Sequence, residues 1–140
     1  MRDLLDTNIL SNITKPEPSA SLLTWMAEQV DDDLFIASLT IAEIHRGILE
    51  KPAGKKRVRL VWKQGGPQSL FAGRILSFDQ KAALVWGEMM AQGRATGRPR
   101  SALDTTVAAI AQSNNCVVVT DNERDFQGIE IINPLRTSAI

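Results

Sequence analysis

Apolar residues along the chain fall into short continuous runs separated by segments with helical spacing. The runs cover residues 4–5, 34–37, 74–78, 117–120 and 130–132. Continuous runs without polar alternation are typical of strands buried on both faces, as in parallel sheets covered by helices. We therefore predict five short strands in a mainly parallel sheet.

Between these runs, apolar residues recur at intervals of three and four positions. Ile41, Ile44 and Ile48 show this spacing, and similar patterns occur in the segments 22–26, 83–90 and 107–111. Strands that alternate with helices are the signature of an α/β fold. At 140 residues the chain has the size of one ordinary domain. We predict a single domain over residues 1–140, built as a three-layer α/β/α sandwich.

Two boundary signals refine this picture. A helical pattern from Lys55 to Phe71 is interrupted by Gly65-Gly66-Pro67, which predicts a break into two pieces. Asp79 precedes a helical pattern over 80–94 and is predicted to cap that helix.

Composition and charge exclude several classes of protein. Hydrophobic residues make up 44% and charged residues 23%, which is far from a disordered composition. Cys116 is the only cysteine, so no internal disulfide can form. The chain shows neither signal-peptide regions nor an apolar run long enough for a membrane span, which predicts a cytoplasmic protein with no membrane contact.

The charges cancel, with 16 basic and 16 acidic residues. Binding to nucleic acid would therefore depend on local clusters of basic residues. One basic run lies within 51–63, and a second consists of Arg94, Arg98 and Arg100. Such runs are either solvated surfaces or guides for a phosphate backbone.

Three acids occur where the patterns predict a strand ending or a helix starting. They are Asp6, Glu43 and Asp104. In an open parallel sheet these points gather at the carboxyl ends of the strands, so the three carboxylates are expected to converge. Converging carboxylates repel one another unless a cation lies between them, and hard oxygen ligands suit Mg²⁺ or Mn²⁺. The pattern predicts a metal-dependent enzyme that acts on phosphates.

A structural interpretation of the same acids stays open. Asp6 is a good cap for the helix that follows it. Thr40-x-x-Glu43 and Ser101-x-x-Asp104 each match the capping-box pattern. Because a carboxylate in the first turn of a helix can still point toward the sheet edge, capping and metal binding are compatible.

Polar neighbours of these positions are candidates for an auxiliary role. Thr7 and Asn8 directly follow Asp6. Thr120, Asp121 and the segment up to Asp125 follow the fourth apolar run, and spacing does not decide which of them reaches the site. The only histidine, His45, is a candidate general base or a surface residue of its helix.

The ordered set of motifs resembles the PIN-domain ribonucleases, and in particular the VapC toxins of bacterial toxin–antitoxin pairs. The resemblance rests on an ordered set of motifs spread over nearly the whole chain. They are Leu5-Asp6-Thr7-Asn8, Thr40-Ile41-Ala42-Glu43, Phe71-Ala72-Gly73-Arg74-Ile75-Leu76, Asp104 before Ala108-Ala109-Ile110-Ala111, and Val119-Thr120-x-Asn122-x-x-Asp125 with a late Asn133-Pro134.

The resemblance implies an α/β/α sandwich whose acidic cleft holds Mg²⁺ or Mn²⁺ and cuts RNA, such as tRNA or another structured RNA. Asp6, Glu43 and Asp104 take the three main acidic places, with Asp6 and Asp104 as the principal metal ligands. Asn122 takes the fourth place, which is often Asp, so Asp121 or Asp125 is a candidate to compensate for the missing charge.

The resemblance also implies partners. A VapB-like antitoxin and a second copy of the chain are expected, with a homodimer as the assembly. Arg46, Arg98 and Arg100 are candidate contacts to RNA.

Two rival functions remain at this point. The first is a non-catalytic PIN-like module that binds RNA or protein and keeps its acids as helix caps. The second is a metal-dependent phosphatase. The commonest kind of phosphatase needs an Asp-x-Asp pair, and the residue two places after Asp6 is Asn8.

Overall fold

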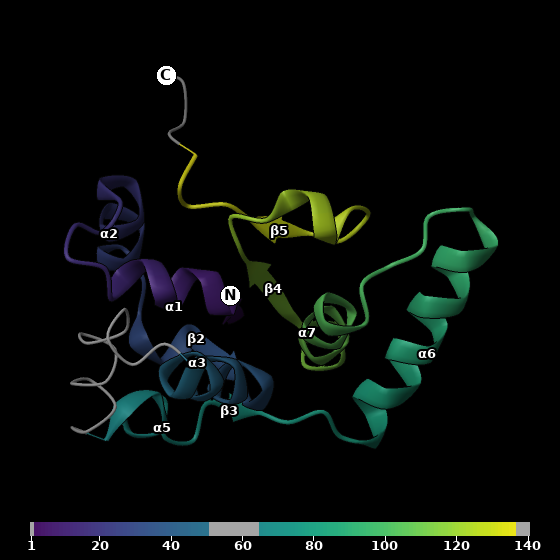
Figure 1. Cartoon of the computed structure of the whole chain (residues 1–140), viewed down its shortest axis with the longest axis horizontal. Helices are drawn as coiled ribbons and strands as arrows, with labels where there is room; N and C mark the ends of the chain where they lie inside the picture. The colour runs from purple at the N-terminus through teal and green to yellow at the C-terminus, as the bar shows by residue number, and fades with distance from the viewer. Residues whose placement is uncertain (1, 51–64, 137–140) are drawn as a thin grey trace.

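A computed structural model of the protein describes residues 2–50 and 65–136 (Figure 1). Within them, five strands form one sheet in the order β3-β2-β1-β4-β5. All four neighbouring pairs are parallel, which confirms the predicted α/β fold. The strands are β1 (Arg2–Leu5), β2 (Leu34–Ala37), β3 (Ile75–Leu76), β4 (Cys116–Val119) and β5 (Ile131–Ile132).

Helices connect the strands and cover both faces of the sheet (Figure 1). The described helices are α1 (Thr7–Ile13), α2 (Ala20–Ala27), α3 (Ser38–Glu50), α5 (Gly66–Leu70), α6 (Gln80–Ala95) and α7 (Ala102–Ser113). Two short 3-10 turns, η1 (Asp31–Asp33) and η3 (Glu123–Phe126), complete the chain. No helix in this part of the chain is both long and apolar enough to span a bilayer.

Two hydrophobic cores lie on opposite faces of the sheet. Leu4 packs in one core with residues of α6 and α7, whereas Leu5 packs in the other with residues of α1 and α2. Successive side chains of a strand point to opposite faces, so both must be apolar when helices cover both sides. This explains why the strands appear in the sequence as continuous apolar runs and not as alternating ones.

The order of the strands fixes where the site forms. The chain adds β2 and β3 on one side of β1 and then returns to add β4 and β5 on the other side. The crevice at the carboxyl ends of β1 and β4 is therefore the topological switch point, where open α/β sheets bind their ligands. Asp6 and Thr120 directly follow these two strands, and the backbone N–H of Asp6 donates to Val119 O at 2.9 Å.

The observed boundaries of β3 differ from the predicted ones, because Arg74 bonds to neighbouring loops and does not belong to the strand. The predicted strand 74–78 is shortened to two residues. The Arg74 guanidinium donates to the backbone oxygens of Asp31, Leu34 and Leu70. This arginine therefore anchors the connection into β3.

The predicted cap of α6 is confirmed, because Asp79 Oδ1 accepts a hydrogen bond from Ala82 N at 2.9 Å. Gly65, with a φ of 102°, directly precedes α5 at the predicted break. Most of the helix expected over Lys55 to Phe71, and the basic run within 51–63, lie outside the described residues.

Candidate functional site

Asp6 lies at the junction between β1 and α1 and has two roles there. Its Oδ1 accepts the N–H of Thr7 at 2.9 Å, which makes it the N-cap of α1. Its Oδ2 accepts a hydrogen bond from Thr120 Oγ1 at 2.9 Å, and only 7% of the residue is exposed. The capping interpretation is therefore correct for Asp6, and it coexists with a position at the switch point.

Thr120 holds the two sides of the crevice together. Besides donating to Asp6, its hydroxyl accepts from Asn122 N at 3.0 Å and from Asn8 Nδ2 at 3.2 Å. Asn8 Oδ1 is buried and has no hydrogen-bond partner among the described residues. The β1–α1 and β4–η3 junctions are thus tied through one buried hydroxyl, and an unused acceptor lies beside it.

Glu43 reaches the site from α3. Thr7 Oγ1 donates to Glu43 Oε1 at 2.6 Å and lies 3.2 Å from Thr40 Oγ1. The prediction that Thr40 caps this helix is wrong, because α3 begins at Ser38 directly after β2 and Thr40 lies inside it, fully buried. Thr40 instead contacts α1, and the hydroxyl of Thr7 sets the position of the Glu43 carboxylate.

Asp104 lies in the first turn of α7. Ser101 is the N-cap of that helix, and its Oγ accepts from Asp104 N at 3.3 Å. This confirms the Ser101 half of the predicted capping box. Burial raises the pKa of Asp104, and the neighbouring carboxylates of Asp125 and Glu43 raise it further, while Ser101 opposes the shift.

One pocket of about 400 Å³ brings the three predicted acids together. We call it the acid pocket. It is lined by Asp6, Thr7, Asn8, Ser11, Asn12, Lys15, Glu43, Asp104, Asp121 and Asn122.

Charge repulsion acts across the acid pocket. Burial raises the pKa of Asp6 to about 6, against the hydrogen bonds from Thr120 and Thr7, and the carboxylates of Asp104 and Glu43 add to the rise. Without a compensating charge, the ionised forms of these acids disfavour one another.

The donor set suits a hard divalent cation. Within the described residues, no three acidic, histidine or cysteine side chains form a ready-made metal site. Mg²⁺ does not require one, because it keeps several waters and binds through one or two carboxylates. Asp6 and Asp104, which repel each other across the pocket, and the unused Asn8 Oδ1 provide oxygen donors of this kind.

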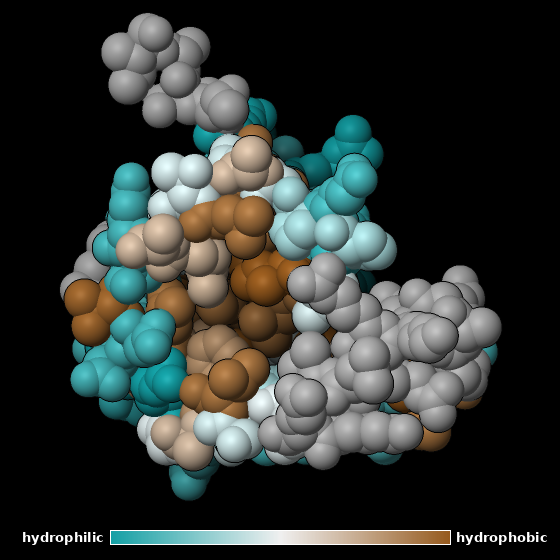
Figure 2. Space-filling model, turned by 90° about the vertical axis from the view of Figure 1, so that its left-hand side faces the viewer, coloured by the Kyte–Doolittle hydropathy of each residue, from teal (hydrophilic) through white to brown (hydrophobic). Residues whose placement is uncertain are grey.

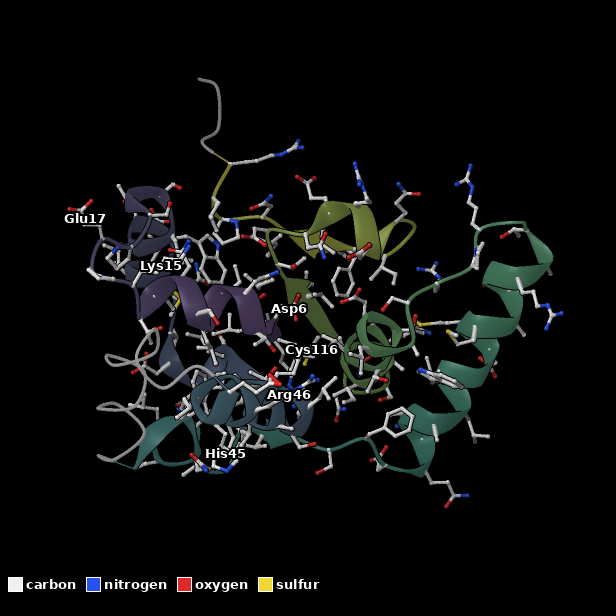
Figure 3. The ribbon with its side chains drawn as sticks, viewed as in Figure 1. Asp6, Lys15, Glu17, His45, Arg46 and Cys116 are labelled. Carbon is white, nitrogen blue, oxygen red and sulfur yellow. The ribbon has the colours of Figure 1, made fainter. Side chains whose placement is uncertain are left out.

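Other predicted residues lie around the pocket and away from it. Asp125 lines a neighbouring pocket, and its Oδ2 accepts from Asn122 Nδ2. On α3, Arg46 pairs with Glu50 at 3.2 Å on an exposed surface and does not line the acid pocket. Exposed His45 lies far from Asp6 (Figure 3), so the structure does not bring it to the acids.

Sequence reasoning did not identify Ser11, Asn12 and Lys15 as residues of the acid pocket. Figure 3 shows Lys15 beyond the end of α1. Ser11 and Asn12 follow Thr7 and Asn8 by four residues, and residues four apart share one face of a helix. This spacing was a signal that could have identified the two α1 residues.

Comparisons with known proteins agree with this architecture. The model of the PIN domain family matches residues 4–131. The sequence is 34% identical over 134 residues to the VapC ribonuclease Y4jK of Sinorhizobium fredii, covering 94% of this chain and 96% of that protein. It is 36% identical over 136 residues to the plasmid stability protein StbB of Pseudomonas syringae pv. tomato, with the same coverage.

A solved structure shows the same fold. The crystal structure of FitAcB from Neisseria gonorrhoeae superposes with a TM-score of 0.87 at 28% identity, covering 96% of this chain and 99% of that one. The protein therefore has a PIN fold with an acid pocket at the switch point of its sheet. The chain belongs to the PIN domain family and, within it, to the VapC-type toxins of toxin–antitoxin systems.

Proposed function

We propose that this protein is a metal-dependent endoribonuclease that acts in the cytoplasm as the toxin of a type II toxin–antitoxin pair. The observation that carries the proposal is the meeting of Asp6, Glu43 and Asp104 in one pocket at the switch point. Membership of the VapC-type family and the ribonuclease named among its relatives support RNA as the substrate class. A structured RNA such as tRNA is the proposed target.

The proposed roles follow from the contacts of each acid. Asp6 and Asp104 hold Mg²⁺ or Mn²⁺. Such a cation, when bound, lowers the pKa of a coordinated water and offsets the negative charge of the phosphate under attack. Glu43, positioned by Thr7, would orient the attacking water and accept its proton as the water oxygen bonds to phosphorus. The phosphorus–oxygen bond to the departing part of the strand breaks, and the departing oxygen takes a proton from solvent.

The fourth acidic place departs from the fullest family pattern, because Asn122 is uncharged. We propose that Asp125 supplies the negative charge that Asn122 lacks. The Asp125 carboxylate accepts a hydrogen bond from Asn122 and raises the pKa of Asp104. In this arrangement Asn122 orients Asp125, and the negative charge of Asp125 beside Asp104 would strengthen the attraction for the cation.

We also propose a VapB-like antitoxin partner and a homodimer, and the toxin–antitoxin complexes among the similar solved structures support the antitoxin. Figure 2 shows a hollow with apolar surface on the side of the molecule where α1, α2 and α5 lie. Exposed leucines occur on two of these helices, Leu23 on α2 and Leu70 on α5. We propose that the apolar face of an antitoxin segment binds in this hollow, because amphipathic segments dock in apolar grooves.

The experiment that tests the activity is cleavage of total RNA and purified tRNA with Mg²⁺ or Mn²⁺, against the same reactions in EDTA. Asp104→Asn should abolish cleavage and still fold, because the capping oxygen of α7 belongs to Ser101. Asp32→Asn is the matched control, since it removes one exposed acid from η1 outside the acid pocket.

Discrete fragments with wild type and Asp32→Asn, and none with folded Asp104→Asn, are the expected result. If folded wild-type protein cuts no RNA with either metal, the activity is refuted and the non-catalytic binding module replaces it. Unfolding of Asp104→Asn would instead assign that carboxylate a structural role.

A further inference from the structure

A second pocket, of about 500 Å³, is lined by Asp125 and Ser101, which form hydrogen bonds with Asn122 and Asp104 of the acid pocket. We call it the arginine pocket. Arg98 and Arg100 reach it from the loop between α6 and α7, and Arg124 reaches it from η3. Asp125 also lines it and connects the two pockets, because it accepts from Asn122 and acts on the pKa of Asp104, both of which line the acid pocket.

The loop that carries two of the arginines is seated firmly on α6. Arg98 N donates to Gly93 O at 2.7 Å. A Cβ on buried Gly93 would lie only 2.8 Å from Arg98 O, so a side chain at that position would push the loop away. The α6–α7 connection is therefore packed against the helix, and it presents Arg98 and Arg100 from a defined backbone.

None of these three arginines forms an ion pair in the described part of the chain. The ion pairs found there are Arg46 with Glu50 and Arg136 with Glu123. The described residues that line this hollow thus include three arginines and one acid, Asp125, in a chain whose formal net charge is zero. Gathered cations repel one another, which favours an anionic ligand.

The chemistry of guanidinium identifies the anion. Its planar fork of N–H donors matches the oxygens of a phosphate and forms paired, charge-assisted hydrogen bonds with it. An RNA strand whose phosphodiester is being cut in the acid pocket carries further phosphates on each side of it. The arginine pocket is linked to the acid pocket through Asp125 and Ser101, so a neighbouring phosphate is its candidate ligand.

We propose that Arg98, Arg100 and Arg124 bind an internal phosphodiester of the RNA strand next to the one that is cut. This inference rests on the proposed function and deepens it. The three arginines are positioning residues that set the register of the strand, whereas the acids perform the chemistry.

The first test measures RNA binding in EDTA, so that cleavage does not enter the result. Arg98→Gln/Arg100→Gln and, separately, Arg124→Gln are compared with wild type over a series of salt concentrations. The double variant is expected to weaken binding at least about tenfold and to reduce the slope of log K against log salt by up to about 0.7, which corresponds to one neutralised phosphate on a single strand. Arg94→Gln is the matched control, because Arg94 belongs to the same basic run but does not line the pocket.

Two further measurements separate this role from a loss of structure. Arg98→Lys/Arg100→Lys, which keeps the charge, should regain part of the affinity. In cleavage assays the Gln variants should raise KM with little change in kcat, because they remove binding that is uniform along the reaction. The inference is overturned if the Gln variants bind RNA as tightly as Arg94→Gln.

Short RNA oligomers distinguish the source of the phosphate. Oligomers with and without a 5′-phosphate should lose affinity equally in the double variant, as expected for an internal phosphodiester. A loss confined to the 5′-phosphorylated oligomers would overturn the internal assignment. Wild-type protein that binds RNA through these arginines without cutting it would refute the proposed activity and leave the arginine pocket supported.

Discussion

At the scale of single residues, Asp6 combines capping with chemistry. The same carboxylate that begins α1 faces Asp104 and Glu43 across the acid pocket, and burial raises its pKa to about 6. A cap alone does not need so buried a position. The proposed cation would offset the cost of keeping this group ionised near neutral pH.

This cost predicts an unusual pH dependence of stability in the metal-free protein. In the unfolded chain Asp6 ionises near 3.8, and in the folded protein at about 6. Between these values the folded state holds a proton that the unfolded state has released, so raising the pH favours unfolding.

The contribution of Asp6 to the free energy of unfolding should therefore fall by about 2–3 kcal/mol from about pH 4 to about pH 7. Urea unfolding in EDTA at a series of pH values gives the free energy of unfolding of wild type and of Asp6→Asn. The difference between the two curves of free energy against pH measures the contribution of Asp6. Asn keeps a capping oxygen for α1 but does not ionise. Parallel curves over this range would contradict the predicted pKa of Asp6.

Asp125 and Asp121 differ in what they contact, and this predicts different effects of substitution. Asp125 accepts from Asn122 and raises the pKa of Asp104, whereas exposed Asp121 lines the acid pocket and its side chain forms no hydrogen bond with the described residues. Outer partners of metal ligands typically contribute about 10- to 100-fold to activity or metal affinity.

Asp125→Asn should therefore lower the rate of RNA cleavage by about 10- to 100-fold. Asp121→Asn should change it much less. Single-turnover cleavage at saturating protein measures both. The reverse order would transfer the compensating role to Asp121.

At the scale of elements, the site depends on a junction between two strand ends. Thr120 is fully buried after β4, and its hydroxyl bonds Asp6, Asn8 and the backbone of Asn122. This hydroxyl therefore joins the segment after β1 to the segment after β4, in addition to the backbone hydrogen bond from Asp6 N to Val119 O.

Thr120→Val keeps the volume of the side chain and removes these hydrogen bonds. We expect the free energy of unfolding to fall by about 1–3 kcal/mol, because buried donors and an acceptor lose their partner. The pKa of Asp6 should rise further, since the Thr120 hydrogen bond lowers it. Thr106→Val, at a partly exposed hydroxyl of α7 that bonds a backbone oxygen within its own helix, is the control. Equal effects of the two substitutions on stability would contradict this account.

At the scale of the whole molecule, the acids come from three separate parts of the chain and repel one another in a single pocket. A cation that binds only the folded protein must stabilise it, by about 1.4 kcal/mol at ten times the dissociation constant. For a chain of 140 residues this corresponds to a rise in Tm of about 5 °C.

Mn²⁺ or Mg²⁺ should therefore raise the Tm of wild type at neutral pH but not that of Asp6→Asn or Asp104→Asn. Differential scanning fluorimetry measures the shift, with Asp32→Asn as the control for general charge effects. An equal rise in all variants would place the cation outside the acid pocket.

Much of this architecture is visible in local patterns. The strands are found because side chains buried on both faces must be apolar, and the run 34–37 coincides with β2. Local chemistry also explains the successful predictions of caps, since Asp79 and Ser101 bond backbone groups only three residues away.

The unsuccessful predictions concern tertiary contacts. Thr40 matches a capping box in sequence, but β2 leads directly into α3, so the helix begins earlier and this hydroxyl packs against α1. Arg124 was not recognised as a partner of Arg98 and Arg100, because η3 meets the α6–α7 loop only in the folded chain. No spacing along the sequence contains that information.

The sequence by itself determined the α/β class, the positions of Asp6 and Asp104 at element boundaries, and the resemblance to VapC toxins, whereas Glu43, expected at a helix start, lies inside α3. These depend on hydrophobic periodicity and on residues within a few positions of one another. Only the tertiary structure decided which polar groups share a pocket, how Thr120 and Thr7 hold the acids, and that Asp125 lies between the acid pocket and the arginine pocket. The physical reason is that the pKa of a carboxylate and the binding of a phosphate depend on burial and on charges brought close by folding, and sequence separation does not measure either quantity.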